Sequence, residues 1–84
     1  MAELTKQQAA WFKKLQRVLD ECPFDTSDFD SYTTGDNDIT VFKNAEEVQQ
    51  HHLDNSTDLP ASVSALDASV FNLKFPFQVA SAAG

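Results

Sequence analysis

Few side chains in this sequence belong to the types that carry out chemistry in proteins. Cys22 is the single cysteine, and His51 and His52 are the two histidines. With an aspartate to orient the base, they would make a thiol nucleophile with its activating histidine. Cys22, however, continues the apolar stripe of the first predicted helix, which predicts a core residue and not a nucleophile.

Other catalytic patterns are missing from the sequence. No serine lies in a G-x-S-x-G turn, and the two glycines, Gly35 and Gly84, are too far apart to form a phosphate-binding loop. A chain of 84 residues also leaves little room for the pocket of roughly 300 Å³ or more that small-molecule enzymes use. We therefore predict that the protein is not an enzyme, has no catalytic residues and needs no cofactor.

Metal binding is the other chemistry open to carboxylates and histidines. The stretch 36–38, Asp-Asn-Asp, resembles part of a calcium loop, but the other ligands of that loop are not in register. His51 and His52 are adjacent and would point in different directions from a helix, whereas a metal-binding pair needs a spacing of three or four. We predict no metal site and a helix-end role for these histidines.

The charge of the chain is strongly one-sided. Thirteen acids and six bases give a net charge of -7 and a pI near 4.4, which excludes direct binding to nucleic acid or to an anionic membrane. Residues 1–19 carry +3, whereas residues 20–67 carry -11. Seven acids fall within nineteen residues and predict a negative patch: Asp20, Glu21, Asp25, Asp28, Asp30, Asp36 and Asp38.

This patch has two interpretations. Acids in turns keep a small protein soluble and close local hydrogen bonds. Alternatively, the patch binds a basic protein partner, and its special form is mimicry of the phosphates that a nucleic-acid-handling protein binds. The candidate partner-binding residues are Asp28, Asp30, Asp36 and Asp38, with Tyr32 as an aromatic anchor.

The first element is a helix. Thr5 and Gln8 form a capping box at its start, and Pro23 stops it at Cys22. Apolar residues recur at three- and four-residue intervals along one face: Trp11, Phe12, Leu15, Val18, Leu19 and Cys22.

A β-hairpin follows, with strands over 29–33 and 38–42 and a turn at Gly35. We expect Ile39 and Val41 to face the first helix, and Thr40 and Phe42 to face the other side. Asn44 is expected to cap a short helix over 45–52.

The remaining chain predicts a loop with one helical turn that begins at Pro60 and packs Val63 and Leu66. A last strand covers 71–79, with five alternating apolar side chains that must face the core: Phe71, Leu73, Phe75, Phe77 and Val79. Pro76 has no amide hydrogen to donate, so this strand should lie at the sheet edge or be bulged at that point.

Together these elements predict an α+β domain over residues 1–80, in the order α-β-β-α-β, with a frayed tail over 81–84. In this architecture the long N-terminal amphipathic helix packs on a small, mostly antiparallel three-stranded sheet. No signal-peptide pattern and no long apolar run occurs, so we expect a cytoplasmic protein with no membrane partner.

The stretch from Trp11 to Pro23, followed by 32–42, resembles small acidic accessory proteins of phages and prophages. The resemblance covers about a third of the chain and implies a bacterial cytoplasm and a role in modulating a host protein. We therefore expect a non-enzymatic acidic protein that binds a basic host surface, as a nucleic-acid mimic or inhibitor. The alternative is a structural module that forms a homodimer through its edge strand and uses its acids for solubility.

Overall fold

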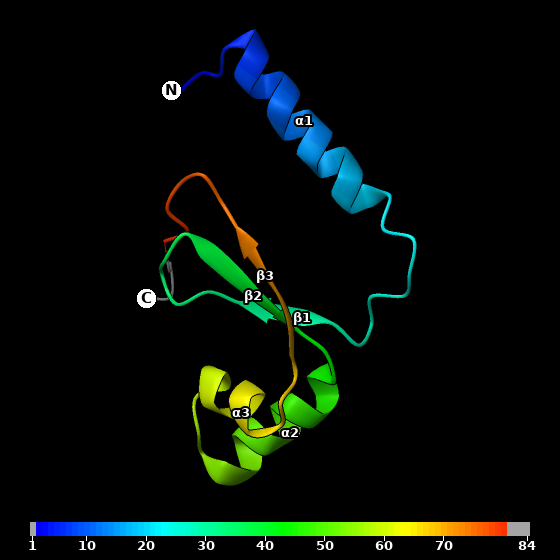
Figure 1. Ribbon diagram of the computed structural model, residues 1–84, viewed down its shortest axis with the longest axis vertical. Helices are drawn as coiled ribbons and strands as arrows, with labels where there is room; N and C mark the ends of the chain where they lie inside the picture. Colours follow the sequence, from blue (N-terminus) through cyan, green and yellow to red (C-terminus); the bar gives the residue numbers. More distant parts are fainter. Residues whose placement is uncertain (1, 81–84) are drawn as a thin grey trace.

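The computed structural model describes residues 2–80 and contains three helices and three strands in that range (Figure 1). In chain order they are α1 (Lys6–Asp20), β1 (Asp30–Tyr32), β2 (Asp38–Phe42), α2 (Ala45–Asn55), α3 (Leu59–Ala65) and β3 (Ser69–Lys74). The α+β class and the order α-β-β-α-β are confirmed, with the second helical stretch divided into α2 and α3. The tail expected over 81–84 lies outside the described residues.

The three strands form one antiparallel sheet in the order β1-β2-β3. The predicted hairpin is therefore confirmed, and its turn contains Gly35 at a φ of 89°, a conformation that costs glycine little. The turn is held by the chain that follows β3. The amide of Phe75 donates to the carbonyl oxygen of Asn37 over 2.8 Å, and that of Val79 donates to Asp36 over 2.8 Å.

The core lies between the sheet and the α2–α3 pair. Phe42, Val48, Val63 and Ala68 are buried, with 1%, 0%, 2% and 2% of their surfaces exposed. The expectation that Phe42 faces away from the core is therefore wrong. The chain turns directly from β2 into α2, and the Lys43 amide donates to the carbonyl oxygen of Ala68, so these helices cover the Phe42 face of the sheet.

The first helix is formed as expected but is packed differently. The capping box is present, since the Gln8 amide donates to Thr5 Oγ1 and the Thr5 amide donates to Gln8 Oε1. The helix ends at Asp20, two residues before the predicted end. None of its fifteen residues is buried, so the packing of this helix on the sheet is a prediction that the structure corrects.

The dimensions of the molecule show that it is more extended than a compact domain of the same length. A compact chain of this length would have a radius of gyration of about 12 Å, whereas the observed value is 15.5 Å. Figure 1 shows the sheet between α1 on one side and α2 with α3 on the other. The longest extent of the molecule is 48 Å and the shortest is 19 Å.

The last strand is shorter and more exposed than predicted. It ends at Lys74, before Pro76, and its position at the sheet edge is confirmed. Phe71 and Leu73 do not face the core but are 62% and 41% exposed. Their face of the sheet lacks the cover that α1 was expected to provide.

The helices after the hairpin begin close to the predicted positions. Asn44 precedes α2 but adopts a left-handed conformation, with φ of 58°, and its side chain makes no capping hydrogen bond. Helix α2 extends three residues beyond the predicted end at His52. Asp58 caps α3, since its carboxylate accepts from the Ala61 amide over 3.0 Å.

Candidate interaction surface

The uncovered face of the sheet forms an open apolar depression with a volume of about 340 Å³, here called the sheet groove. It is lined by residues from the sheet and from the segment after α1: Cys22, Phe24, Thr26, Phe29, Val41, Val70, Phe71 and Leu73. None of the residues of α1 lines it. The protein therefore presents a connected apolar surface that its own first helix leaves open.

Strand register explains why apolar side chains gather here. Val41 pairs with Phe71, and Ile39 pairs with Leu73, so four apolar residues of β2 and β3 share one face. A β-bulge between β2 and β3 inserts Val70, and both Val70 and Phe71 then line the groove. The rings of Phe24 and Phe29, 5.3 Å apart, extend this surface beyond the strands.

Acidic residues border the sheet groove. The segment 20–30, which supplies four of the lining residues, carries five acids and no base: Asp20, Glu21, Asp25, Asp28 and Asp30. All five are exposed, but Asp30 pairs with Phe42 and so lies on the α2–α3 side of the sheet, which leaves the other four beside the groove. One base lies nearby, because the Lys43 ammonium is 5.4 Å from the centre of the Phe29 ring. The groove is thus apolar at its centre and mainly negative along one border.

The pKa of one of these acids, Asp25, is lowered by a hydrogen bond within its own loop. The Ser27 amide donates to Asp25 Oδ1 over 3.0 Å, and this bond, helped by the Ser27 hydroxyl, lowers the pKa of Asp25 below its ordinary value of 3.8. Asp25 therefore stays ionised at the border of the groove down to acidic pH.

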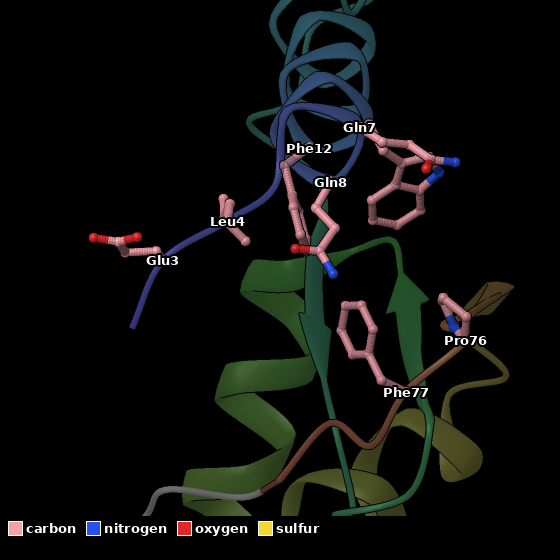
Figure 2. Close-up of a pocket in the computed structure, with 8 residues that line it drawn as sticks. Glu3, Leu4, Gln7, Gln8, Phe12, Pro76 and Phe77 are labelled. Carbon is pink, nitrogen blue, oxygen red and sulfur yellow. The ribbon is translucent and has the colours of Figure 1, made fainter. Parts of the chain in front are cut away.

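A second, larger depression lies between the start of α1 and the chain after β3, with a volume of about 730 Å³. Figure 2 shows Phe12 and Gln8 extending from α1 towards Phe77. The Phe77 ring is 6.5 Å from that of Trp11 and 6.3 Å from that of Phe12, while Trp11 and Phe12 meet edge to face at 4.9 Å. These contacts tie the N-terminal half of α1 to the chain beyond the sheet.

The structure divides the predicted acidic site between two ends of the hairpin. Asp30 lies opposite Phe42, at the end of β2, whereas Asp38 begins β2. The four-residue separation along the strand corresponds to about 14 Å. Asp28 precedes β1 and accompanies Asp30, and Asp36 lies in the turn beside Asp38. The four carboxylates therefore form two pairs and not one patch.

Two of the predicted site residues have roles inside the fold. The Tyr32 ring packs on the core, 6.1 Å from the Phe42 ring, so it is directed away from the surface where an anchor would act. Asp38 Oδ2 accepts a hydrogen bond from Asn72 Nδ2 over 2.9 Å and links β2 to β3.

The side chains that could act as nucleophiles, bases or metal ligands are not assembled into a catalytic centre. Cys22 is an exposed free thiol, not the core residue that the helical stripe predicted. His51 Nδ1 lies 3.0 Å from Ser62 Oγ, which in turn lies 2.7 Å from Thr57 Oγ1. Ser62 is 0% exposed, so this contact joins α2 to α3 and gives no accessible nucleophile. Within residues 2–80 no three metal-ligating side chains lie together.

Sequence reasoning did not identify the sheet groove, although its signal was present. The stripe of α1 and the apolar row of β3 were each assigned to one shared core. The chain carries more large apolar side chains than the α2–α3 core can bury. Within residues 2–80, eleven such side chains are exposed, including Trp11, Val18, Phe24, Phe71 and Leu73.

No family model, curated protein or solved structure matches this chain. Over the described range, none of the helices has the length and apolar character that crossing a bilayer requires. Inference about function therefore rests on the two surfaces described above.

Proposed function

We propose that this chain is a small non-enzymatic interaction protein that binds a protein partner through the sheet groove. The observation that carries the proposal is the uncovered apolar face itself, with Phe71 62% exposed at its centre. Large exposed apolar patches rimmed by polar residues are typical of protein-binding surfaces. The acidic border favours a partner that combines apolar side chains with basic ones.

This proposal keeps the basic partner expected from the charge of the chain but moves its binding site. Solvated carboxylates contribute mainly to the association rate and to partner choice, whereas buried apolar contacts provide most of the affinity. The groove, not the hairpin acids, therefore supplies the binding energy. The exposed thiol of Cys22 supports a reducing compartment, and we propose the cytoplasm.

The test is affinity capture from a bacterial lysate with two matched variants. Phe71→Asp places a charge in the groove, and Leu53→Asp places the same charge at a residue of α2 that is 63% exposed and does not line the groove. We expect the wild-type chain and Leu53→Asp to retain the same proteins and Phe71→Asp to lose them. Equal retention by all three proteins would refute binding through the groove.

Modulation of a host nucleic-acid-handling protein through the hairpin acids is the second candidate. Asp36 is exposed in the turn, where a basic surface could reach it. The separation into two carboxylate pairs gives this candidate less support than the groove. Conversion of Asp36 and Asp38 to lysine, neither of which lies in the segment 20–30 beside the groove, would weaken capture under this candidate. It would leave the apolar contacts of the groove in place if the groove is the binding site.

A further inference from the structure

We infer that the occupant of the sheet groove is helix α1 of a second copy of this chain. In the resulting dimer, α1 of each protomer packs its apolar stripe on the sheet groove of the other. This inference rests on the proposed function, because it assigns the partner of the same groove.

Helix α1 carries a second exposed apolar surface, although Trp11 and Phe12 contact Phe77 near its start. Its stripe includes Trp11, Val18 and Leu19, which are 44%, 63% and 56% exposed. A helix of about fifteen residues is marginal in water without tertiary contacts, even with a good cap. The helix therefore requires an apolar surface to pack on, and the sheet groove requires an apolar helix of this kind.

The exposed area of the chain exceeds what one standard dimer interface would bury. A folded monomer of this mass exposes about 5,000 Å², whereas this chain exposes 6791 Å². The excess of about 1,800 Å² is larger than the roughly 800 Å² that each partner contributes to a standard interface. Two copies can therefore cover both surfaces without a further component.

Charge also favours this pairing. Helix α1 itself carries +3, because Asp20 offsets one of its four bases, Lys6, Lys13, Lys14 and Arg17, all of which are exposed. The segment 20–30 beside the groove carries five acids and no base, and four of these acids lie on the groove side. A reciprocal arrangement brings these opposite charges together twice, whereas packing α1 on a second α1 would bring like charges together.

The chain's own α1 is held away from the groove at both ends. Near its start, Trp11 and Phe12 contact Phe77, which lies beyond the end of β3. After its end, Phe24 packs on Phe29, and these two rings themselves line the groove. The helix of another copy keeps the same contacts within its own chain, but those contacts do not hold it away from this groove.

The experiment is a complementation test read by sedimentation velocity and light scattering. Val18→Asp disrupts the α1 stripe, Phe71→Asp disrupts the groove, and Leu53→Asp is the matched control with equal exposure elsewhere. We expect the wild-type chain and the control to reach twice the 9.3 kDa chain mass as concentration rises. Each of the other variants should dimerise at least about 100-fold more weakly or not at all.

Mixing Val18→Asp with Phe71→Asp then tests whether α1 of one copy packs on the groove of the other. An intact α1 from Phe71→Asp can pack on the intact groove of Val18→Asp, so two monomeric proteins should form a one-to-one complex. Circular dichroism and urea unfolding of each variant confirm that the α2–α3 core is still folded. The absence of a complex on mixing would overturn reciprocal packing, as would a wild-type chain that is monomeric up to about 500 µM.

The result also separates this inference from the proposed function. A monomeric wild-type chain whose lysate partner is lost in Phe71→Asp would refute the dimer and support the groove as a binding site. A wild-type chain that neither dimerises nor shows any difference between Phe71→Asp and Leu53→Asp in capture would refute both.

Discussion

Two phenylalanines on opposite faces of the sheet should respond very differently to truncation. Phe42 is 1% exposed in the α2–α3 core, whereas Phe71 is 62% exposed in the sheet groove. Phe42→Ala should lower the free energy of unfolding by about 3–5 kcal/mol, because it removes buried apolar surface and leaves a cavity. Phe71→Ala should lower it by about 2 kcal/mol or less, since 62% of this residue is already in water.

The same substitution at Phe71 should weaken association. A phenylalanine side chain has roughly 200 Å² of surface, so the exposed part of Phe71 is about 120 Å². At about 25 cal/mol per Å², burial of this area contributes about 3 kcal/mol for each groove, which corresponds to about 100-fold in the dissociation constant for one partner. In the reciprocal dimer Phe71 occurs twice, so the loss should be about 10⁴-fold. Phe71 should therefore affect binding strongly and monomer stability weakly.

The assay is urea unfolding followed by circular dichroism, at a protein concentration of about 1 µM where association adds little. With a slope near 1 kcal/mol per M for a small protein, Phe42→Ala should move the midpoint by about 3 M or unfold the chain. The midpoint of Phe71→Ala should stay within about 2 M of the wild type, a smaller loss than for Phe42→Ala. An equal loss for both variants at this concentration would show that the groove is covered within the monomer, which refutes the reasoning.

Three further predictions concern local contacts. Ser62→Ala should cost about 1–3 kcal/mol in urea unfolding, because it removes a buried hydroxyl that joins α2 to α3. Thr5→Ala should lower the helical signal in circular dichroism through loss of a cap worth about 1 kcal/mol, with an unchanged midpoint for the core. Carboxyl NMR titration should give Asp25 a pKa below 3.8, and Ser27→Ala should raise it part of the way back, because the backbone donor remains. Since the folded pKa is lowered, the contribution of Asp25 to stability is present above the ordinary pKa and is lost as pH falls through the folded value.

Local patterns allowed most of the elements to be predicted. The Thr5 capping box, the turn at Gly35 and the edge position of the strand before Pro76 depend on contacts within a few residues, and all three were confirmed. Boundaries were less accurate, since β3 ends at Lys74 and not at Val79. Apolar alternation continues through Pro76, but backbone pairing with β2 does not.

The candidate site was harder to predict because it depends on which apolar surfaces meet. Alternation in β2 and β3 assigns Val41, Phe71 and Leu73 to one face but does not show whether a helix covers it. Asp28 and Asp38 are only ten residues apart in sequence, yet they lie at opposite ends of the extended hairpin. Tyr32 and Phe42 were expected near the surface and lie against the core.

Composition, charge distribution and the identity of each element follow from the order of residues, because they depend on local propensities and on short-range hydrogen bonds. The packing of these elements depends on which apolar surfaces contact each other, and those surfaces are distant in sequence. Helices α2 and α3 follow β2 directly and cover the Phe42 face, so the face with Phe71 and Leu73 is left open. The contacts with Phe77 hold the start of that helix at the chain beyond β3, and only the three-dimensional structure shows that the helix and the sheet each leave an apolar surface exposed in one chain.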